Sequence, residues 1–287
     1  MLSLSLLFAA ALQFTEADAK LAYKTAADLV ENHTPRDAGT IRGQLAANHI
    51  LDLASMTGAD VRRDGFRAMT PRGERSFTNL CAKFENNKTN RWVVLVSHYD
   101  TKPGVPCPGA NDGASTAGLL VALANAYVNW PTPRGNLLLI WTDSEECIGE
   151  RYSDGDGFQG SKHAAVKLAE TGLNVQAVIC LDMLGDADLD ISIPSNSTPV
   201  LSKIAVHAAR RAGYPGLVKP ISDEVKDDHV AFLDNGFRAI DLIDFNYGSR
   251  PGLNDYWHTD KDTMERVSEA SLLKSGKVVV ELLNLLL

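Results

Sequence analysis

Two adjacent carboxylates, Glu145 and Glu146, come just after an apolar run that ends at Asp143. A run of this kind is typical of a buried strand, and the loops after parallel strands are where α/β enzymes commonly place their chemistry. One carboxylate of such a pair can bind a metal ion while its neighbour transfers a proton. The pair therefore predicts a metal-assisted acid–base site.

Further candidate ligands stand at the ends of other apolar runs or in turn-rich loops. They are His98, Asp100, Asp112, Asp182 and His258. Taken singly, Asp112 could simply cap the helix that follows it, and a lone loop histidine such as His258 is usually solvated. Asp182 is harder to explain, because a carboxylate at the end of an apolar strand needs a partner or a metal ion. Zinc binds imidazole and carboxylate groups, so the set as a whole predicts a zinc centre.

The elements that must position these residues alternate along the chain. A capped helix over residues 46–54 precedes a predicted edge hairpin of residues 61–69 and 76–84. Buried strands are predicted over residues 92–96, 137–141, 175–181 and 239–243. Helices are predicted over residues 115–127, 161–170, 199–212, 230–233 and 268–286. Strands that alternate with helices predict right-handed crossovers, and hence an α/β fold with a mainly parallel sheet.

Composition narrows the function class. The chain has 287 residues, of which 45% are hydrophobic and 22% charged, as in an ordinary globular protein. Its net charge of −8 argues against a nucleic-acid partner, since phosphate binding needs a basic face. We find no run of the roughly 18 apolar residues that a membrane span needs, and so expect no stable span.

The N-terminus and the cysteines bear on the compartment. Residues 1–12 are apolar and small residues stand at Ala17 and Ala19, which predicts a signal peptide over residues 1–19 and a secreted or periplasmic enzyme. Residues 20–287 would then form a single catalytic domain. The alternative is an apolar N-terminal helix that packs on the body. In an oxidising compartment, Cys107 and Cys147 could form a disulfide bridge, because both lie in loops that carry candidate site residues.

The candidate residues occur in a familiar order. The motifs are His98-Tyr99-Asp100, Gly109 to Gly113, Glu145-Glu146, Leu181 to Gly185, Asp228-His229 and His258-Thr259. From about Trp92 to the C-terminus, the chain resembles the zinc aminopeptidase and glutaminyl cyclase superfamily. That resemblance implies a three-layer α/β sandwich of the phosphorylase/hydrolase type, with helices on both faces of a mixed, mostly parallel sheet. It also implies that peptide or protein N-termini are the substrates.

In the glutaminyl cyclase branch, the matching residues would hold one zinc ion: Asp112, Glu146 and His258. Glu145 would carry a proton from the α-amine of an N-terminal glutamine to the leaving ammonia. Asp182 and Asp227 would act as hydrogen-bond acceptors, and the product would be pyroglutamate.

In the aminopeptidase branch, the same framework would hold two zinc ions and release an N-terminal residue by hydrolysis. His98 and Asp182 would bind one ion, Glu146 and His258 the other, and Asp112 would bridge them. Glu145 would be the general base. A third reading is an inactive peptide-binding homologue, which Glu145 and the complete ligand set argue against.

Three features favour the cyclase branch. The segment of residues 147–163 is similar to the extended loop of the cyclases. Asp227 places a second aspartate directly before the Asp228-His229 motif, and Trp257 stands directly before His258. By this resemblance Asp100, Asp228, His229 and Trp257 support the ligands or line the pocket. One difference is Asp241, where animal cyclases have a histidine. We therefore predict a glutaminyl-peptide cyclotransferase, with the aminopeptidase as the alternative.

Overall fold

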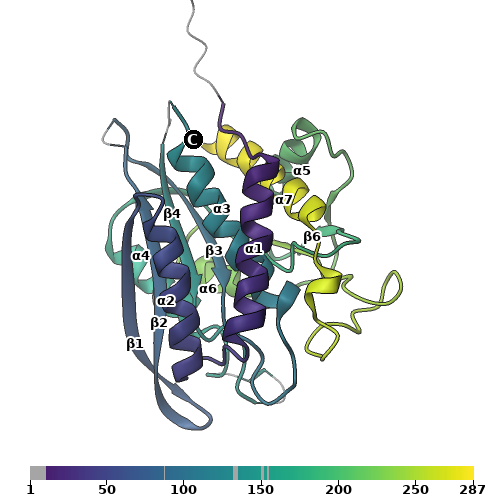
Figure 1. Ribbon diagram of the computed structural model, residues 1–287. Helices are drawn as coiled ribbons and strands as arrows, with labels where there is room; N and C mark the ends of the chain where they lie inside the picture. The colour runs from purple at the N-terminus through teal and green to yellow at the C-terminus, as the bar shows by residue number, and fades with distance from the viewer. Residues whose placement is uncertain (1–10, 87, 132–134, 150–151, 154) are drawn as a thin grey trace, which may run out of the picture.

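The computed structural model describes residues 11–86, 88–131, 135–149, 152–153 and 155–287, and its centre is one mixed sheet (Figure 1). The strands are β1 (Asp60–Thr70), β2 (Gly73–Phe84), β3 (Arg91–His98), β4 (Asn136–Thr142), β5 (Asn174–Asp182), β6 (Ile191–Ile193), β7 (Val218–Pro220) and β8 (Ala239–Ile243). Among the described residues, these strands form an eight-stranded sheet in the order β1-β2-β4-β3-β5-β8-β6-β7.

The middle of the sheet is parallel, the margin of β1 and β2 is antiparallel, and β6 joins β8 antiparallel while pairing in parallel with β7 at the other margin. β3 pairs in parallel with β4 and β5, and β5 with β8, whereas β1, β2 and β4 form an antiparallel edge. Parallel strands end at the same edge of a sheet. His98, the last residue of β3, therefore lies level with Thr142, and Asp182 pairs with Ile243.

Helices cover both faces of the sheet (Figure 1). One layer holds α1 (Glu16–His33), α2 (Ile41–Ser55), α3 (Thr116–Val128), α5 (Pro199–Arg211) and α7 (Glu269–Leu286). The other face carries α4 (Gln159–Glu170) and α6 (Asp228–Asp234). The chain is thus the predicted three-layer α/β sandwich.

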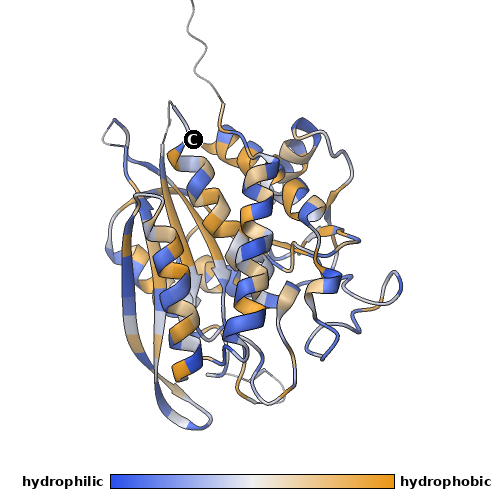
Figure 2. Cartoon of the chain, viewed as in Figure 1, coloured by the Kyte–Doolittle hydropathy of each residue, from blue (hydrophilic) through white to orange (hydrophobic). Residues whose placement is uncertain are grey.

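Strand β3 shows why its sequence is apolar throughout. Val93 and Leu95 belong to the hydrophobic core under α1, α3 and α7, while Val94 and Val96 belong to the core under α4 and α6. A strand covered on both faces loses the usual alternation of polar and apolar residues. Figure 2 shows the contrast, because the central strands are hydrophobic along their length and β1 at the edge is largely hydrophilic.

Every helix and strand predicted from the sequence is present within a few residues of its expected bounds. The segment before residue 40 differs, because it contains α1, for which no element was predicted. Thr15 caps α1 through a capping box with Asp18. Two short strands, β6 and β7, were also missed, since three residues carry too little pattern.

The predicted signal peptide lies partly outside the described residues, which begin at residue 11. Leu12 and Phe14 are buried, and the amide side chain of Asn284 hydrogen-bonds both backbone polar groups of Leu12. Gly276 in α7 makes room for the Phe14 ring, since a Cβ there would lie 2.3 Å from it. Residues 11–19 of the predicted leader thus include side chains that pack in the core, and its removal stays a prediction. Export stays a prediction.

Candidate active site

The predicted site residues meet at the carboxyl edge of the parallel strands, beside a cavity of about 530 Å³. β3 brings His98, β5 brings Asp182, and the loop after β4 brings Glu145 and Glu146. The cavity is lined by Lys102, Asp112, Glu145, Glu146, Cys147, Tyr152, Phe158, Asp182, Glu224, Val225, Lys226, Asp227, Ile243, Phe245, Trp257 and His258. The site is therefore assembled from the last residues of β3 and β5 and from the loops that follow β3, β4, β7 and β8.

Asp112 lies between two histidines and joins two groups of metal-binding side chains. Its Oδ1 is 3.1 Å from His98 Nε2, and its Oδ2 is 3.2 Å from His258 Nε2. His98 Nε2 also lies 3.3 Å from Asp182 Oδ1, and His258 Nε2 lies 2.9 Å from Glu146 Oε1. In each group of three, the ligand atoms lie within 4.8 Å of one another. All five predicted ligands are thus brought together.

The loop that carries Asp112 is shaped by glycine and by a buried aspartate. Gly113 has φ of 94°, and a Cβ there would lie 3.0 Å from both the His98 ring and the Asp100 carbonyl. Only glycine allows this left-handed turn so close to His98. Asp262 then accepts hydrogen bonds from the backbone nitrogens of Asn111 (2.7 Å) and Asp112 (3.2 Å). Asp112 is thus held beside the two histidines and does not cap α3, whose N-cap is Ser115.

Asp100 holds the acidic pair in place. Its two carboxylate oxygens accept hydrogen bonds from the backbone nitrogens of Glu145 and Glu146, each at 3.2 Å. Ser144, directly before the pair, has φ of 62°. A left-handed backbone is unfavourable for a residue other than glycine, and such residues cluster at functional sites. Asp100 therefore positions the backbone of the pair, whereas the sequence had suggested it only as a support for His98.

Burial and neighbouring charges shift the pKa values of the site carboxylates in opposite directions. Burial raises the pKa of Glu145 well above its ordinary value, and the negative charges of Glu146 and Asp227 add to this while His98 opposes it. For Asp112, burial also disfavours the carboxylate, but the adjacent His258 and His98 imidazoles outweigh it and lower the pKa. Asp112 is thus kept ionised, whereas Glu145 is suited to carry a proton.

The doubled aspartate forms the start of α6. Asp227 is the N-cap of α6, and its carboxylate accepts a hydrogen bond from the backbone N–H of Asp228 and lines the cavity. The Asp228 carboxylate is buried and accepts a 2.6 Å hydrogen bond from the Thr142 hydroxyl. Asp241 is fully buried, and burial together with the charge of Asp227 raises its pKa well above the ordinary value. His229 is fully buried and lies outside the cavity lining. It therefore supports α6 and does not line the pocket.

Aromatic side chains complete the cavity wall. Trp257 stacks on His258 with ring centroids 3.8 Å apart, and Phe245 lies 5.3 Å from Trp257. Tyr152 and Phe158 come from the extended loop after the acidic pair, with centroids 5.2 Å apart. Asp156 shapes this loop by accepting hydrogen bonds from the backbone nitrogens of Ile148 and Gly149. The segment that favoured the cyclase branch thus contributes to the pocket.

Two residues that shape the site escaped sequence reasoning. Asp262 belongs to the acidic loop around His258, but nothing in its spacing marks it as the residue that holds Asp112. Arg36 is fully buried and donates to the carbonyls of Tyr99 (2.9 Å) and Gly109 (2.8 Å), so it supports the backbone beside His98 and Asp112. No motif surrounds Arg36, and only its distant partners reveal its role.

The bridge between Cys107 and Cys147 that the sequence allowed is absent, and both residues are free thiols. Cys147 Sγ lies 2.7 Å from Lys102 Nζ, whereas Cys107 Sγ faces Asp262 at 3.7 Å. The two cysteines therefore have different partners, and each partner lies on a different loop from its cysteine.

The residues present suit a transition metal ion. Asp112 Oδ2 is buried with no aligned hydrogen bond among the described residues, although it faces His258. Two carboxylates and one imidazole in each group are donors that zinc accepts. The fold and the site together define a metal-dependent α/β enzyme.

The chain belongs to peptidase family M28, whose model matches residues 79–283. It is 27% identical to a glutaminyl-peptide cyclotransferase of Bos taurus over 277 residues, which cover 82% of this chain and 73% of the relative. Among solved structures, it resembles an Acidobacteriales bacterium glutaminyl cyclase with TM-score 0.88 and 30% identity, covering 96% of both chains. A glutaminyl cyclase of Porphyromonas gingivalis matches with TM-score 0.84 and 26% identity over 94% of this chain and 98% of that one. The protein is therefore an enzyme of the cyclase and exopeptidase superfamily, as its motifs predicted.

Proposed function

We propose that the protein is a zinc-dependent glutaminyl-peptide cyclotransferase, which converts N-terminal glutamine to pyroglutamate and releases ammonia. The observation that carries this proposal is the cavity, in which Glu145 and the donor group of Asp112, Glu146 and His258 face the same space as an aromatic wall. Two of the wall residues, Tyr152 and Phe158, come from the extended loop that typifies the cyclase branch. The likeness to cyclases of known structure supports the same branch.

The reaction closes a ring and needs one proton to move. The α-amine nitrogen bonds to the side-chain amide carbon, the C–N bond to the amide nitrogen breaks, and ammonia leaves. Glu145 takes the proton from the attacking amine and gives it to the leaving nitrogen, and its raised pKa suits both steps. A zinc ion held by Asp112, Glu146 and His258 would supply Lewis acidity to the amide carbonyl.

The other residues orient the substrate and stabilise the geometry. Asp182 and Asp227 line the cavity and offer acceptors to the substrate amine and amide N–H groups. The Trp257 and Phe245 rings give the glutamine side chain an apolar wall, which excludes water from the reacting atoms. Because the site holds the α-amine next to the side-chain amide, less entropy is lost on reaching the transition state, and this increases the rate.

One observation favours a second candidate, a di-zinc aminopeptidase. His98, Asp112 and Asp182 form a second donor group that shares Asp112 with the first. In that enzyme both groups would be filled, and Glu145 would serve as general base for hydrolysis of the first peptide bond.

A paired experiment separates the two candidates. The purified enzyme is incubated with one peptide that begins with glutamine and with a matched peptide that begins with leucine. The masses of the products are measured by mass spectrometry, and the metal content per chain is determined on the same preparation. We expect loss of ammonia from the first peptide, no change in the second, and one tightly bound zinc ion at the active site. Release of a free amino acid by a protein with two zinc ions at the active site would overturn the cyclase in favour of the aminopeptidase.

We also propose that the enzyme is exported, on the basis of the apolar residues 1–12 and the small residues that follow. N-terminal sequencing of protein recovered from outside the cytoplasm tests this. An uncleaved N-terminus in a cytoplasmic pool would overturn it.

A further inference from the structure

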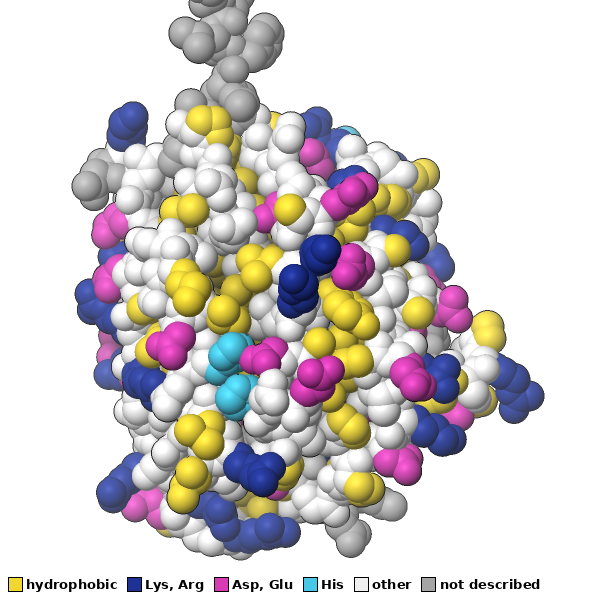
Figure 3. Space-filling model, in the orientation of Figure 1, with side chains coloured by type: hydrophobic (Ala, Val, Ile, Leu, Met, Phe, Trp, Pro, Cys, Tyr) yellow, Lys and Arg dark blue, Asp and Glu magenta, His cyan; other side chains and the backbone are white. Residues whose placement is uncertain are grey.

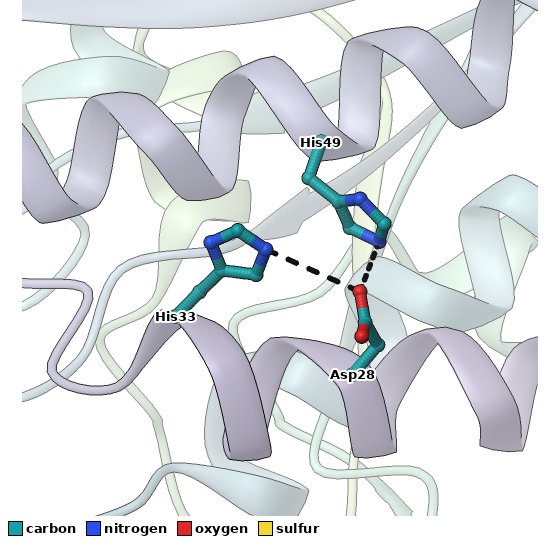
Figure 4. Close-up of side chains that lie close together, drawn as sticks. All are labelled: Asp28, His33 and His49. Atoms are coloured by element: carbon teal, nitrogen blue, oxygen red, sulfur yellow. Dashed lines mark ion pairs between the residues drawn. The ribbon is translucent and has the colours of Figure 1, made fainter.

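Outside the cavity lining, three side chains converge where α1 lies against α2. Asp28 and His33 come from α1 and His49 from α2, and Figure 4 shows both imidazoles turned toward the Asp28 carboxylate. His49 Nε2 lies 2.6 Å from Asp28 Oδ2, and His33 Nε2 lies 4.0 Å from the same oxygen. We propose that Asp28, His33 and His49 form a second metal site, which takes a divalent transition ion such as Zn²⁺ and clamps α1 to α2.

The distances suit a shared ion. The three ligand atoms lie within 4.8 Å of one another. Donors bound tetrahedrally to zinc at about 2.0–2.1 Å are about 3.3 Å apart. The 2.6 and 4.0 Å separations lie on either side of that value, so small rotations of the side chains would equalise them.

A simple hydrogen-bonded cluster accounts for the arrangement less well. His49 Nε2 is buried, yet among the described residues it makes no aligned hydrogen bond, even to the Asp28 oxygen 2.6 Å away. The two imidazole rings are stacked, with centroids 5.0 Å apart and an angle of 25° between their planes. Two protonated rings would repel each other in this stack. Two neutral rings can instead direct their lone pairs at one cation.

The surroundings keep the donors ready to bind. Burial lowers the pKa of His33, with the charges of His49 and Arg36 acting in the same direction and Asp28 opposing them, and the neutral imidazole is the form that binds metal. The amide of Asn32 donates a 2.6 Å hydrogen bond to Asp28 Oδ1, which leaves Oδ2 for the ion. A hydrogen-bonded outer residue of this kind commonly orients a ligand carboxylate.

The chemistry of the donors selects the class of ion. Two imidazoles and one carboxylate favour zinc, nickel, copper or cobalt, whereas calcium and magnesium prefer oxygen ligands. The side chains of His33, His49 and Asp28 are 18%, 28% and 37% exposed, so an ion can enter from solvent and keep a water ligand. Figure 3 shows adjacent histidine side chains, with acidic ones close by, on the face that carries α1 and α2.

The metal ion would stabilise the packing of α1 on α2 and would take no part in the chemical reaction. His33 ends α1, and Arg36, three residues further on, supports the backbone beside His98 and Asp112. A metal ion at the end of α1 would thus hold the segment from which Arg36 reaches the active-site loops.

Metal counting on the zinc-loaded holoenzyme tests the proposal. Wild type and His49→Gln are dialysed to equilibrium against the same micromolar Zn²⁺, and zinc per chain is measured by mass spectrometry. We expect one ion fewer in His49→Gln, and a further variant, Asn32→Ala, to bind this ion about 10-fold more weakly. His207→Gln, an exposed histidine on α5, is the matched control and should keep the wild-type count.

The readout is a difference between two proteins, so it depends neither on how many ions the active site holds nor on which reaction it performs. Unchanged circular dichroism of His49→Gln ensures that folded proteins are compared. Equal zinc counts in wild type and His49→Gln at saturating Zn²⁺ would overturn the second site while leaving the proposed cyclase activity intact.

Discussion

Asp262 accepts a hydrogen bond from the backbone nitrogen of Asp112, although 150 residues separate them in sequence. The same carboxylate holds Asn111 N and the Tyr247 hydroxyl, the latter at 2.7 Å, and the residue is fully buried. The loop before the last helix therefore carries His258 and also fixes the loop that carries Asp112. The proposed metal site of Asp112, Glu146 and His258 thus depends on one short segment near the C-terminus.

Asp262→Asn should weaken zinc binding about 10- to 100-fold, which is typical when a residue that orients a metal ligand is changed. The asparagine keeps the shape but replaces one acceptor oxygen with an N–H₂ group that faces backbone donors. Zinc affinity measured by competition with a chelator checks this. Asp260→Asn, two residues away and exposed, should bind zinc like wild type. Equal affinity in both variants would contradict the role given to Asp262.

Glu145→Gln should lower kcat by about 10²- to 10⁴-fold, the usual contribution of a positioned acid–base group. Its zinc content should stay at the wild-type level, because Glu146 remains and Asp100 still holds the backbone of both residues. Steady-state kinetics and metal analysis on the same preparation measure the two effects. If the variant lost its zinc instead, the roles of Glu145 and Glu146 would have to be exchanged.

Trp257→Ala should raise KM about 3- to 10-fold, because an aromatic contact is worth roughly 0.5–1.5 kcal/mol beyond its burial. Trp257 lines the cavity and stacks on His258, yet it carries no proton and binds no metal. The effect on kcat should therefore be smaller than that on KM. Trp257→Phe keeps a ring at this position and serves as the control. A fall in kcat with KM unchanged would show that the ring acts on His258 rather than on substrate.

His229→Phe should make the protein less sensitive to acid. Burial lowers the pKa of His229 to about 4, and neither ring nitrogen has a hydrogen-bond partner among the described residues. The unfolded-state pKa of histidine is about 6.5, so below that pH the imidazole is protonated in the unfolded chain while it stays neutral in the folded chain. The free energy of unfolding therefore decreases as the pH falls from about 6.5 toward 4.

The loss assigned to His229 amounts to on the order of 3 kcal/mol between pH 7 and pH 4. Urea unfolding of wild type and His229→Phe at several pH values in this range measures it, with His207→Phe as an exposed control. Stability curves of wild type and His229→Phe that run parallel across the range would argue against a neutral buried imidazole.

Most of the fold could be predicted because its signals are local. The run Trp92 to Val96 is apolar at every position, which indicates a strand covered on both faces, and turn residues mark its ends. The helix α1 was missed because an apolar start resembles a leader whether or not it packs, and the signal peptide over residues 1–19 stays a prediction. Only the contacts of Phe14 with Gly276 and of Leu12 with Asn284 distinguish a packed segment from an exposed one.

The sequence by itself determined which residues could do the chemistry, because the donors stand at the ends of strands whose apolar pattern is readable. It also determined their order, which carried the resemblance. Tertiary structure alone decided that Asp112 lies between His98 and His258, that Cys107 and Cys147 stay apart, and that His33 meets His49 over Asp28. The physical reason is that these relationships join segments far apart in the chain, and their distances depend on how the helices and strands pack.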